Sequence, residues 1–295
     1  MDQLFGIPLP ALMSQLLIGL VNGSFYAMLS LGLAVIFGLL NVINFAHGTL
    51  YMVGAFLAWM GMNYLGLSYW TMLLLAPVIV GALGYFIERT MLRWLYKVDH
   101  VYGLLLTLGI TLVLEGVFRA AYGVSGQPYG APSELTGAVD LGFMMLPTYR
   151  VWVVVASLAA CFSTGYVIER TKLGAYLRAG TENPKLVEAF GVNVPVMVTL
   201  TYVFGVALAA LAGVLAAPII QVSPLMGSNL IITVFAVVVI GGMGSIIGSI
   251  VTGLGLGVIE GFTRVFYPEL SATVVFILMA VILLVRPSGL FGKDN

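Results

Sequence analysis

Long apolar stretches separated by short polar ones make up nearly the whole chain. The region 229–263 is too long for one ordinary span and contains Gly241-Gly242-Met243-Gly244, so we expect two short helices there. Seven other stretches are long enough to cross about 30 Å of hydrocarbon as helices; they lie near residues 11–40, 49–67, 70–87, 101–122, 150–168, 194–220 and 271–286. The pattern predicts an all-α, polytopic integral membrane protein with eight or nine transmembrane helices. We expect one transmembrane domain over residues 1–295.

Three interruptions break this helical pattern. Asn22-Gly23-Ser24 falls within the first apolar stretch, which is either one tilted helix or a broken one. The segments Asn41–Gly48 and Gly241–Ser245 lie in corresponding halves of the chain, and paired breaks of this kind indicate a transport pathway lined by irregular backbone. His47 is either a polar group on this pathway or a histidine satisfied at a helix end. The predicted pathway residues are Asn41, Asn44, His47, Gly48, Gly241, Gly242, Gly244 and Ser245.

The basic residues predict the orientation, because lysine and arginine gather in cytoplasmic loops. Three basic residues, Arg119, Arg150 and Arg264, fall on the opposite side, where the loop 123–149 is expected to form a short helix or hairpin. This arrangement places the N-terminus outside and the C-terminus in the cytoplasm. The nine basic residues on the cytoplasmic side are Arg89, Arg93, Lys97, Arg170, Lys172, Arg178, Lys185, Arg286 and Lys293.

The longest polar segment, about 169–193, lies on this cytoplasmic side. Leu173 to Ala179 can form two turns of helix that Gly180 ends in the left-handed conformation. Asn183 can cap a second short helix, with Pro184 at its first position and Gly191 at its end. Leu186 and Phe190 lie four residues apart and share a face of this helix. The segment is therefore either a docking surface for a soluble partner or a solvated connection.

Small and charged residues inside the apolar stretches have structural explanations. Glu115 and Glu260 each precede an arginine by four residues, at Arg119 and Arg264, so we expect ion pairs at the outer interface rather than a proton relay. Small residues also recur every four positions after the second break, which predicts close packing against another helix; they are Ser245, Ser249, Gly253, Gly257 and Gly261.

Composition excludes several other classes of protein. Hydrophobic residues make up 61% of the 295 residues and charged residues 8%, against about a quarter charged in soluble domains. Twelve basic and twelve acidic residues leave no net charge to favour nucleic acid. The chain has no G-x-x-x-x-G-K-[ST] motif for ATP and only two histidines, too few to indicate a metal site. We therefore expect neither an enzyme nor a cofactor in this chain.

Five motifs in order give the chain a resemblance to a known family: Asn44–Gly48, Arg178–Asn193, Gly241–Ser245, Glu260 and Arg286–Gly292. Together they resemble the LivH-type permease of bacterial ABC importers for branched-chain amino acids. The resemblance implies the ABC importer permease fold with broken or re-entrant segments. It also implies that the loop 173–191 couples to an ATPase. The coupling residues so implied are Gly174, Arg178, Ala179, Glu182, Asn183, Leu186, Glu188, Ala189, Phe190 and Gly191.

The same resemblance implies partners and a location. The partners are a second permease of the LivM type, two ABC ATPase subunits that bind ATP and Mg²⁺, and a periplasmic substrate-binding protein. The location is the bacterial inner membrane, with the N-terminus in the periplasm. Thr233 stands where members for branched-chain amino acids often have lysine, and Ile247 where proline is common. Other amino acids, amides, urea and aromatic acids are therefore alternative substrates, and an ion-gradient-driven secondary transporter is the alternative function.

Overall fold

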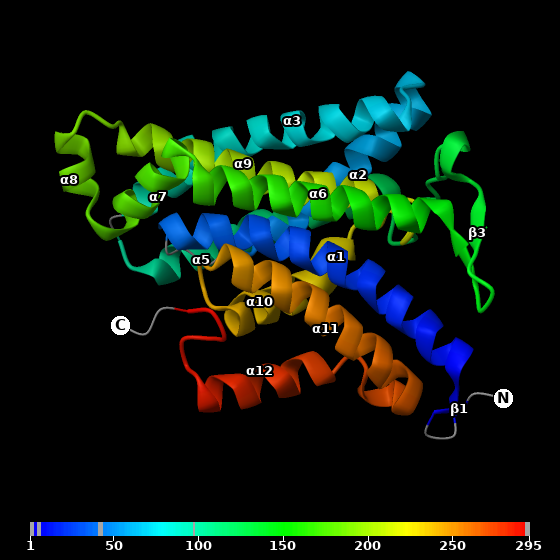
Figure 1. The fold of residues 1–295 in the computed structure, drawn as a ribbon. Helices are drawn as coiled ribbons and strands as arrows, with labels where there is room; N and C mark the ends of the chain where they lie inside the picture. The colour runs from blue at the N-terminus through cyan, green and yellow to red at the C-terminus, as the bar shows by residue number, and fades with distance from the viewer. Residues whose placement is uncertain (1–2, 5–6, 41–43, 97, 293–295) are drawn as a thin grey trace.

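The computed structural model describes residues 3–4, 7–40, 44–96 and 98–292. Its long helices run between two ends of the molecule (Figure 1). The predicted all-α membrane fold is confirmed, and six helices, α1, α3, α5, α6, α9 and α11, are long and apolar enough to span a membrane. The count of eight or nine crossings stays a prediction. The principal helices are α1 (Leu9–Leu40), α2 (Ala46–Leu65), α3 (Tyr69–Ile87), α5 (His100–Tyr122), α6 (Thr148–Arg170), α9 (Val194–Ala216), α10 (Met226–Gly241), α11 (Ile246–Phe266) and α12 (Val274–Val285).

Short elements distinguish the two ends. One end carries the strands β1 (Gln3–Leu4), β2 (Ile7–Pro8), β3 (Ala138–Asp140) and β4 (Met145–Pro147) and the 3-10 turns η2 (Ser133–Leu135) and η3 (Pro268–Leu270). The antiparallel pair β3–β4 confirms the predicted hairpin. The other end carries α7 (Lys172–Glu182) and α8 (Pro184–Ala189) (Figure 1). There α3 continues through the π-turn η1 (Glu88–Leu92) into α4 (Arg93–Leu95).

The helices α1 and α11 pack closely through small residues. A Cβ atom on Gly257 would lie 2.4 Å from the backbone of Gly19 and Gly23, and one on Gly253 would lie 2.5 Å from Ala27 N. The predicted packing role of the small-residue stripe is confirmed. Asn22-Gly23-Ser24 lies inside α1 and does not break it, because Gly23 serves this contact and not a turn.

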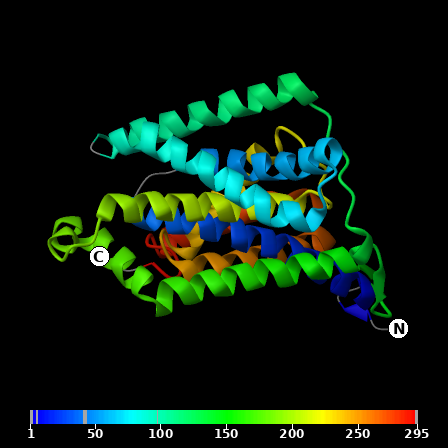
Figure 2. The ribbon, with the colours of Figure 1, turned by 90° about the horizontal axis from the view of Figure 1, so that it is seen from above.

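The helix α2 lies in the middle of the bundle, packed on α9 (Figure 2). A Cβ on Gly54 would lie 2.5 Å from Ala210 O, and one on Gly213 would lie 2.0 Å from Tyr51 O. The side chains of Tyr51 and Phe56 are fully buried there. Close backbone contact therefore fixes α2 against α9.

Candidate coupling and translocation sites

The polar loop forms two helices, as predicted, but the first is longer than expected. α7 continues through Gly180 to Glu182, so the prediction that Gly180 ends the helix in the left-handed conformation is wrong. Gly180 is buried and α7 ends at Asn183 instead. Asn183 Oδ1 accepts a hydrogen bond from Leu186 N at 3.1 Å, and Gly191 has φ +83°, so both predicted ends of α8 are confirmed.

Close packing fixes α7 to the end of α6. A Cβ atom on Gly174 would lie 1.6 Å from Ile168 O, so only glycine permits this approach. Arg178 Nη1 donates to the same carbonyl oxygen at 2.7 Å. These two residues are among those predicted to couple the permease to an ATPase, and that role stays a prediction. The contacts show them holding α7 against α6.

The helix α8 exposes apolar side chains at the tip of the molecule. Phe190 is 80% exposed and Leu186 54% exposed, whereas the side chain of Val187, on the same helix, is buried. Ala179, Asn183, Glu188, Ala189 and Gly191 are exposed as well, and the side chain of Glu182 lies outside the described residues. An exposed phenylalanine next to a leucine at the end of a loop is typical of a protein contact.

The described part of the first predicted pathway segment, residues 44–48, is largely buried. Asn41 lies outside the described residues. Asn44 Nδ2 donates to Tyr202 OH at 3.3 Å, and His47 Nε2 donates to Leu29 O at 3.0 Å. Both side chains are buried, and a Cβ on Gly48 would lie 2.7 Å from Gly227 O. In this conformation the first segment is packed structure around the beginning of α2, and its place on a pathway stays a prediction.

The second segment borders a cleft of about 470 Å³. Gly244 and Ser245 line the cleft together with Arg178 and Glu169, so it lies beside α7. Ser245 also caps α11, with its Oγ accepting from Gly248 N at 3.1 Å. Gly241 and Gly242 are buried in contacts between backbones, where the positive φ of Gly242, +97°, requires glycine.

The C-terminal segment 286–292 completes this region, which the sequence alone did not indicate. Leu290 N donates to Ile240 O at 2.8 Å, and Phe291 N donates to Gly241 O at 3.1 Å. Phe291 and Gly292 line the cleft. Two motifs about 45 residues apart therefore form one unit at the end of α10.

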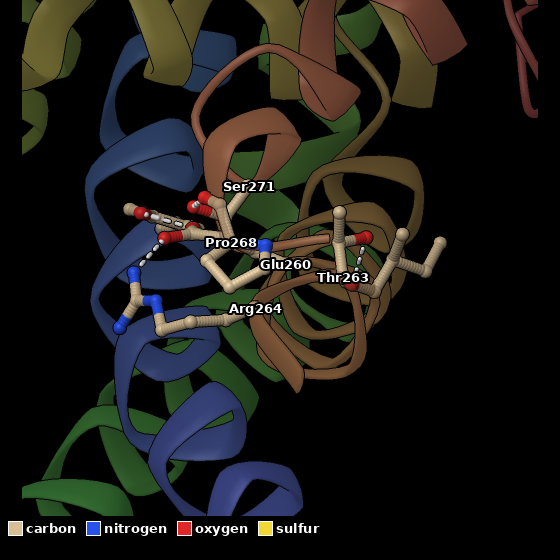
Figure 3. Close-up of polar contacts among 7 residues, drawn as sticks. Glu260, Thr263, Arg264, Pro268 and Ser271 are labelled. Carbon is tan, nitrogen blue, oxygen red and sulfur yellow. Dashed lines mark hydrogen bonds and ion pairs between the residues drawn. The ribbon is translucent and has the colours of Figure 1, made fainter. Parts of the chain in front are cut away.

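Three carboxylates are buried among the residues whose side chains the structure describes. Glu260 forms the predicted ion pair with Arg264, at 2.6 Å (Figure 3). Glu115 does not form the predicted pair with Arg119 among the described residues, because it accepts a hydrogen bond from Ser228 Oγ while Arg119 is exposed. Glu88 was not predicted as a site residue.

Glu88 ties α3 to α9. Thr199 Oγ1 donates to Glu88 Oε2 at 2.7 Å, and Tyr96 OH donates to Oε1 at 3.1 Å. Burial and the Glu88 carboxylate raise the pKa of the Tyr96 phenol, so Tyr96 remains a donor at neutral pH. Because Thr199 lies near the beginning of α9, which follows α8, this contact joins the helix after the coupling loop to the end of α3.

Comparisons with known proteins agree with this architecture. A family model described as the permease component of a branched-chain amino acid transport system matches residues 15–284. The permease protein BraD of Pseudomonas aeruginosa is 31% identical over 96% of both chains, and LivH of Escherichia coli K12 is 28% identical over 96% of both. LivM of Salmonella typhimurium is 28% identical over 90% of this chain and 67% of its own. No solved structure matches. The chain belongs to the family of branched-chain amino acid transport permease components.

Proposed function

We propose that the chain is the membrane subunit of an ATP-driven importer for amino acids, with branched-chain amino acids as the first candidates. BraD and LivH are named as permease proteins of high-affinity branched-chain amino acid transport systems, and this supports the substrate class. The partners in this proposal are a LivM-type permease, two ABC ATPase subunits and a periplasmic binding protein. The similarity to LivM supports a permease pair built from two related chains.

The exposed Leu186 and Phe190 on α8 are the observation that carries this proposal. α8 lies at the end of the molecule where α6 ends and α9 begins (Figure 1). The sequence places Arg170 at the end of α6, Lys172 at the beginning of α7 and Lys185 in α8. By the distribution of basic residues this end faces the cytoplasm, where ATPase subunits reside. The sequence contains no phosphate-binding loop of its own, so ATP and Mg²⁺ belong to the partners.

The geometry supports a mechanism in which force on α8 reaches the bundle along two routes. The first runs through α7, which Gly174 and Arg178 hold against α6. The second runs through α9, which begins at Val194 directly after the loop and is tied to α3 by Glu88. A movement of α8 would therefore shift α6 and α9 together and alter the cleft beside Ser245.

Phe190→Asp tests this proposal. Burial of a phenylalanine contributes about 1.5–3 kcal/mol, so ATPase association should weaken by about one to two orders of magnitude. Val187→Asp is the matched control, because Val187 is buried on the same helix and its replacement should instead lower the amount of folded permease. Both quantities are measured for each variant, by titrating detergent-purified permease with the ATPase and by quantitative immunoblotting. Normal permease abundance with normal ATPase binding for Phe190→Asp would contradict docking through this residue.

The buried carboxylates Glu88, Glu115 and Glu260 favour a second candidate, an ion-gradient-driven transporter. This function predicts uptake by the chain alone in vesicles that carry a proton or sodium gradient. Gradient-driven uptake without ATPase subunits would favour it over the importer. No uptake under any gradient, together with uptake when the ATPases and ATP are supplied, would exclude it.

A further inference from the structure

Glu115 is a buried carboxylate without a cationic partner among the described residues. The hydroxyl of Ser228, in the first turn of α10, donates to its Oε1. The positive end of the α10 dipole lies on this side and favours a negative charge. Arg119, one turn further along α5, is exposed and does not pair with it. A buried carboxylate without a counter-charge is costly, and inside a membrane protein such a residue is typical of a substrate or ion pathway.

The buried face of α5 carries polar side chains over its middle part. Every fourth residue from Gly103 is buried, and the stripe continues through Thr107 and Thr111 to Glu115. The other faces expose large apolar side chains such as Leu112. Figure 2 shows α5 along one edge of the bundle. The helix thus turns its polar stripe toward the bundle and its apolar faces outward.

Opposite this stripe lies α2, which runs parallel to α5. Phe45 N, at the beginning of α2, donates to Thr107 Oγ1 at 3.2 Å. Eleven residues later on both helices, the rings of Phe56 and Phe118 lie 4.6 Å apart. Positions four and seven residues after Phe45 share the face that joins these two contacts. The ring of Phe45 itself lies 5.0 Å from that of Phe235 on α10, so at the beginning of α2 this face lies between α5 and α10.

Thr49 occupies the first of these positions. It lies level with Thr111, because each of the two threonines follows the contact between Phe45 and Thr107 by four residues on its own helix. Its hydroxyl is buried and has no hydrogen-bond partner in the part of the chain that the structure describes. A Cβ on Gly227, the residue before Ser228, would lie 3.1 Å from Thr49 N, so this position also adjoins α10. Thr49 is therefore an unused polar group between α5 and the beginning of α10.

We propose that Glu115, Thr111 and Thr49 bind the α-ammonium group of an amino acid in transit across the membrane. An ammonium group has three N–H donors, and these three side chains offer three oxygen acceptors. The Thr111 hydroxyl donates a hydrogen bond to Thr107 O at 3.0 Å. The lone pairs of its oxygen therefore remain available to accept a hydrogen bond from a ligand. This inference rests on the proposed function and names the part of the substrate that this chain recognises.

Labelling of a cysteine at Thr111 tests the site. Thr111→Cys is made in a Cys161→Ala background, and the complete complex with its partner subunits is supplied with ATP. Glu115 should make cationic aminoethyl methanethiosulfonate react about tenfold or more faster than the anionic sulfonatoethyl reagent, after correction for their rates with free thiol. Glu115→Gln keeps an oxygen for Ser228 and should remove most of this preference. L-Leucine should slow the reaction, whereas 4-methyl-2-hydroxypentanoate, which has a hydroxyl in place of the ammonium, should not.

Three results would overturn the site. They are equal rates for the two reagents, protection by sodium or by the hydroxy acid as strong as that by leucine, and no reaction at Thr111→Cys. The leucine comparison does not need Glu115→Gln, so it remains decisive if that variant folds poorly. Uptake of L-leucine by the unsubstituted complex is measured in parallel. ATP-dependent uptake with any of these contrary results would reject the site and retain the importer, whereas absence of uptake would reject the importer itself.

Discussion

Glu260 lies on the largely apolar helix α11. Two partners, Tyr26 and Arg264, contact its carboxylate. Tyr26 OH donates to Oε2 at 2.7 Å, and Arg264 Nη2 lies 2.6 Å from Oε1. Arg264→Met should lower the free energy of unfolding by about 1–3 kcal/mol, because a buried carboxylate loses its counter-charge while Arg264 itself is partly exposed. Denaturant unfolding in mixed micelles measures this quantity. Glu260→Leu combined with Arg264→Met should recover part of the loss, and a double variant less stable than Arg264→Met would contradict this explanation.

At the level of single residues, the sequence correctly predicted the features that depend only on neighbouring residues. The cap at Asn183 and the left-handed Gly191 follow from neighbouring residues alone, and both are present. Gly180 has the same local signal, yet burial keeps it inside α7. Glu115 shows the same limit: spacing favoured Arg119, but Ser228, which is 113 residues away, supplies the hydrogen bond. Contacts distant in sequence are not visible in helical spacing.

At the level of helices, the α1–α11 contact offers a matched test. Gly257→Val should lower the amount of folded permease, because its Cβ would lie 2.4 Å from the backbone of α1 and overpacking costs about 1–3 kcal/mol or more. Gly255→Val is the control, because a Cβ on Gly255 meets nothing within 4 Å. Membrane abundance and size-exclusion profiles measure the effect. Equal abundance of the two variants would contradict the packing described here.

The contact between α6 and α7 predicts a separation of binding from transport. In Gly174→Ala the added carbon cannot remain 1.6 Å from Ile168 O, so α7 must shift while the exposed face of α8 is unchanged. Coupling changes of about 0.5–2 kcal/mol are typical, so uptake should fall roughly 2- to 30-fold at nearly normal ATPase binding. The neighbouring exposed Ala175 provides the control as Ala175→Ser. Equal loss of ATPase binding and uptake would show that the contact only supports the docking surface.

The helices themselves follow from the apolar pattern, because length and hydrophobicity are local properties. The small-residue stripe of α11 predicted its close packing, although it did not name α1 as the neighbour. The docking of Leu290 and Phe291 on the end of α10 could not be predicted, because backbone hydrogen bonds between distant segments leave no periodic signal. The two predicted breaks were correctly located, between α1 and α2 and between α10 and α11, but the contact of Gly38 with Gly244 depends on how distant helices pack.

At the scale of the whole molecule, the basic loops gather at one end and the β3–β4 hairpin lies at the other (Figure 1). Exposed positions at each end, Ser133 and Lys185, allow a test of orientation as single cysteines, since Cys161 is buried. In intact cells a reagent that does not cross the inner membrane should label Ser133→Cys. Lys185→Cys should react only after permeabilisation. The reverse labelling pattern would invert the proposed topology.

Reconstitution in vesicles measures ATP-driven uptake by the assembled importer most directly. The permease, its partner permease and the two ATPase subunits are placed in vesicles with the binding protein and radiolabelled L-leucine at the face that carries the hairpin. ATP is supplied at the face that carries α7 and α8. We expect uptake that requires ATP and falls to background when the ATPases carry a substitution that prevents hydrolysis. Uptake at the full rate with the inactive ATPases would contradict it.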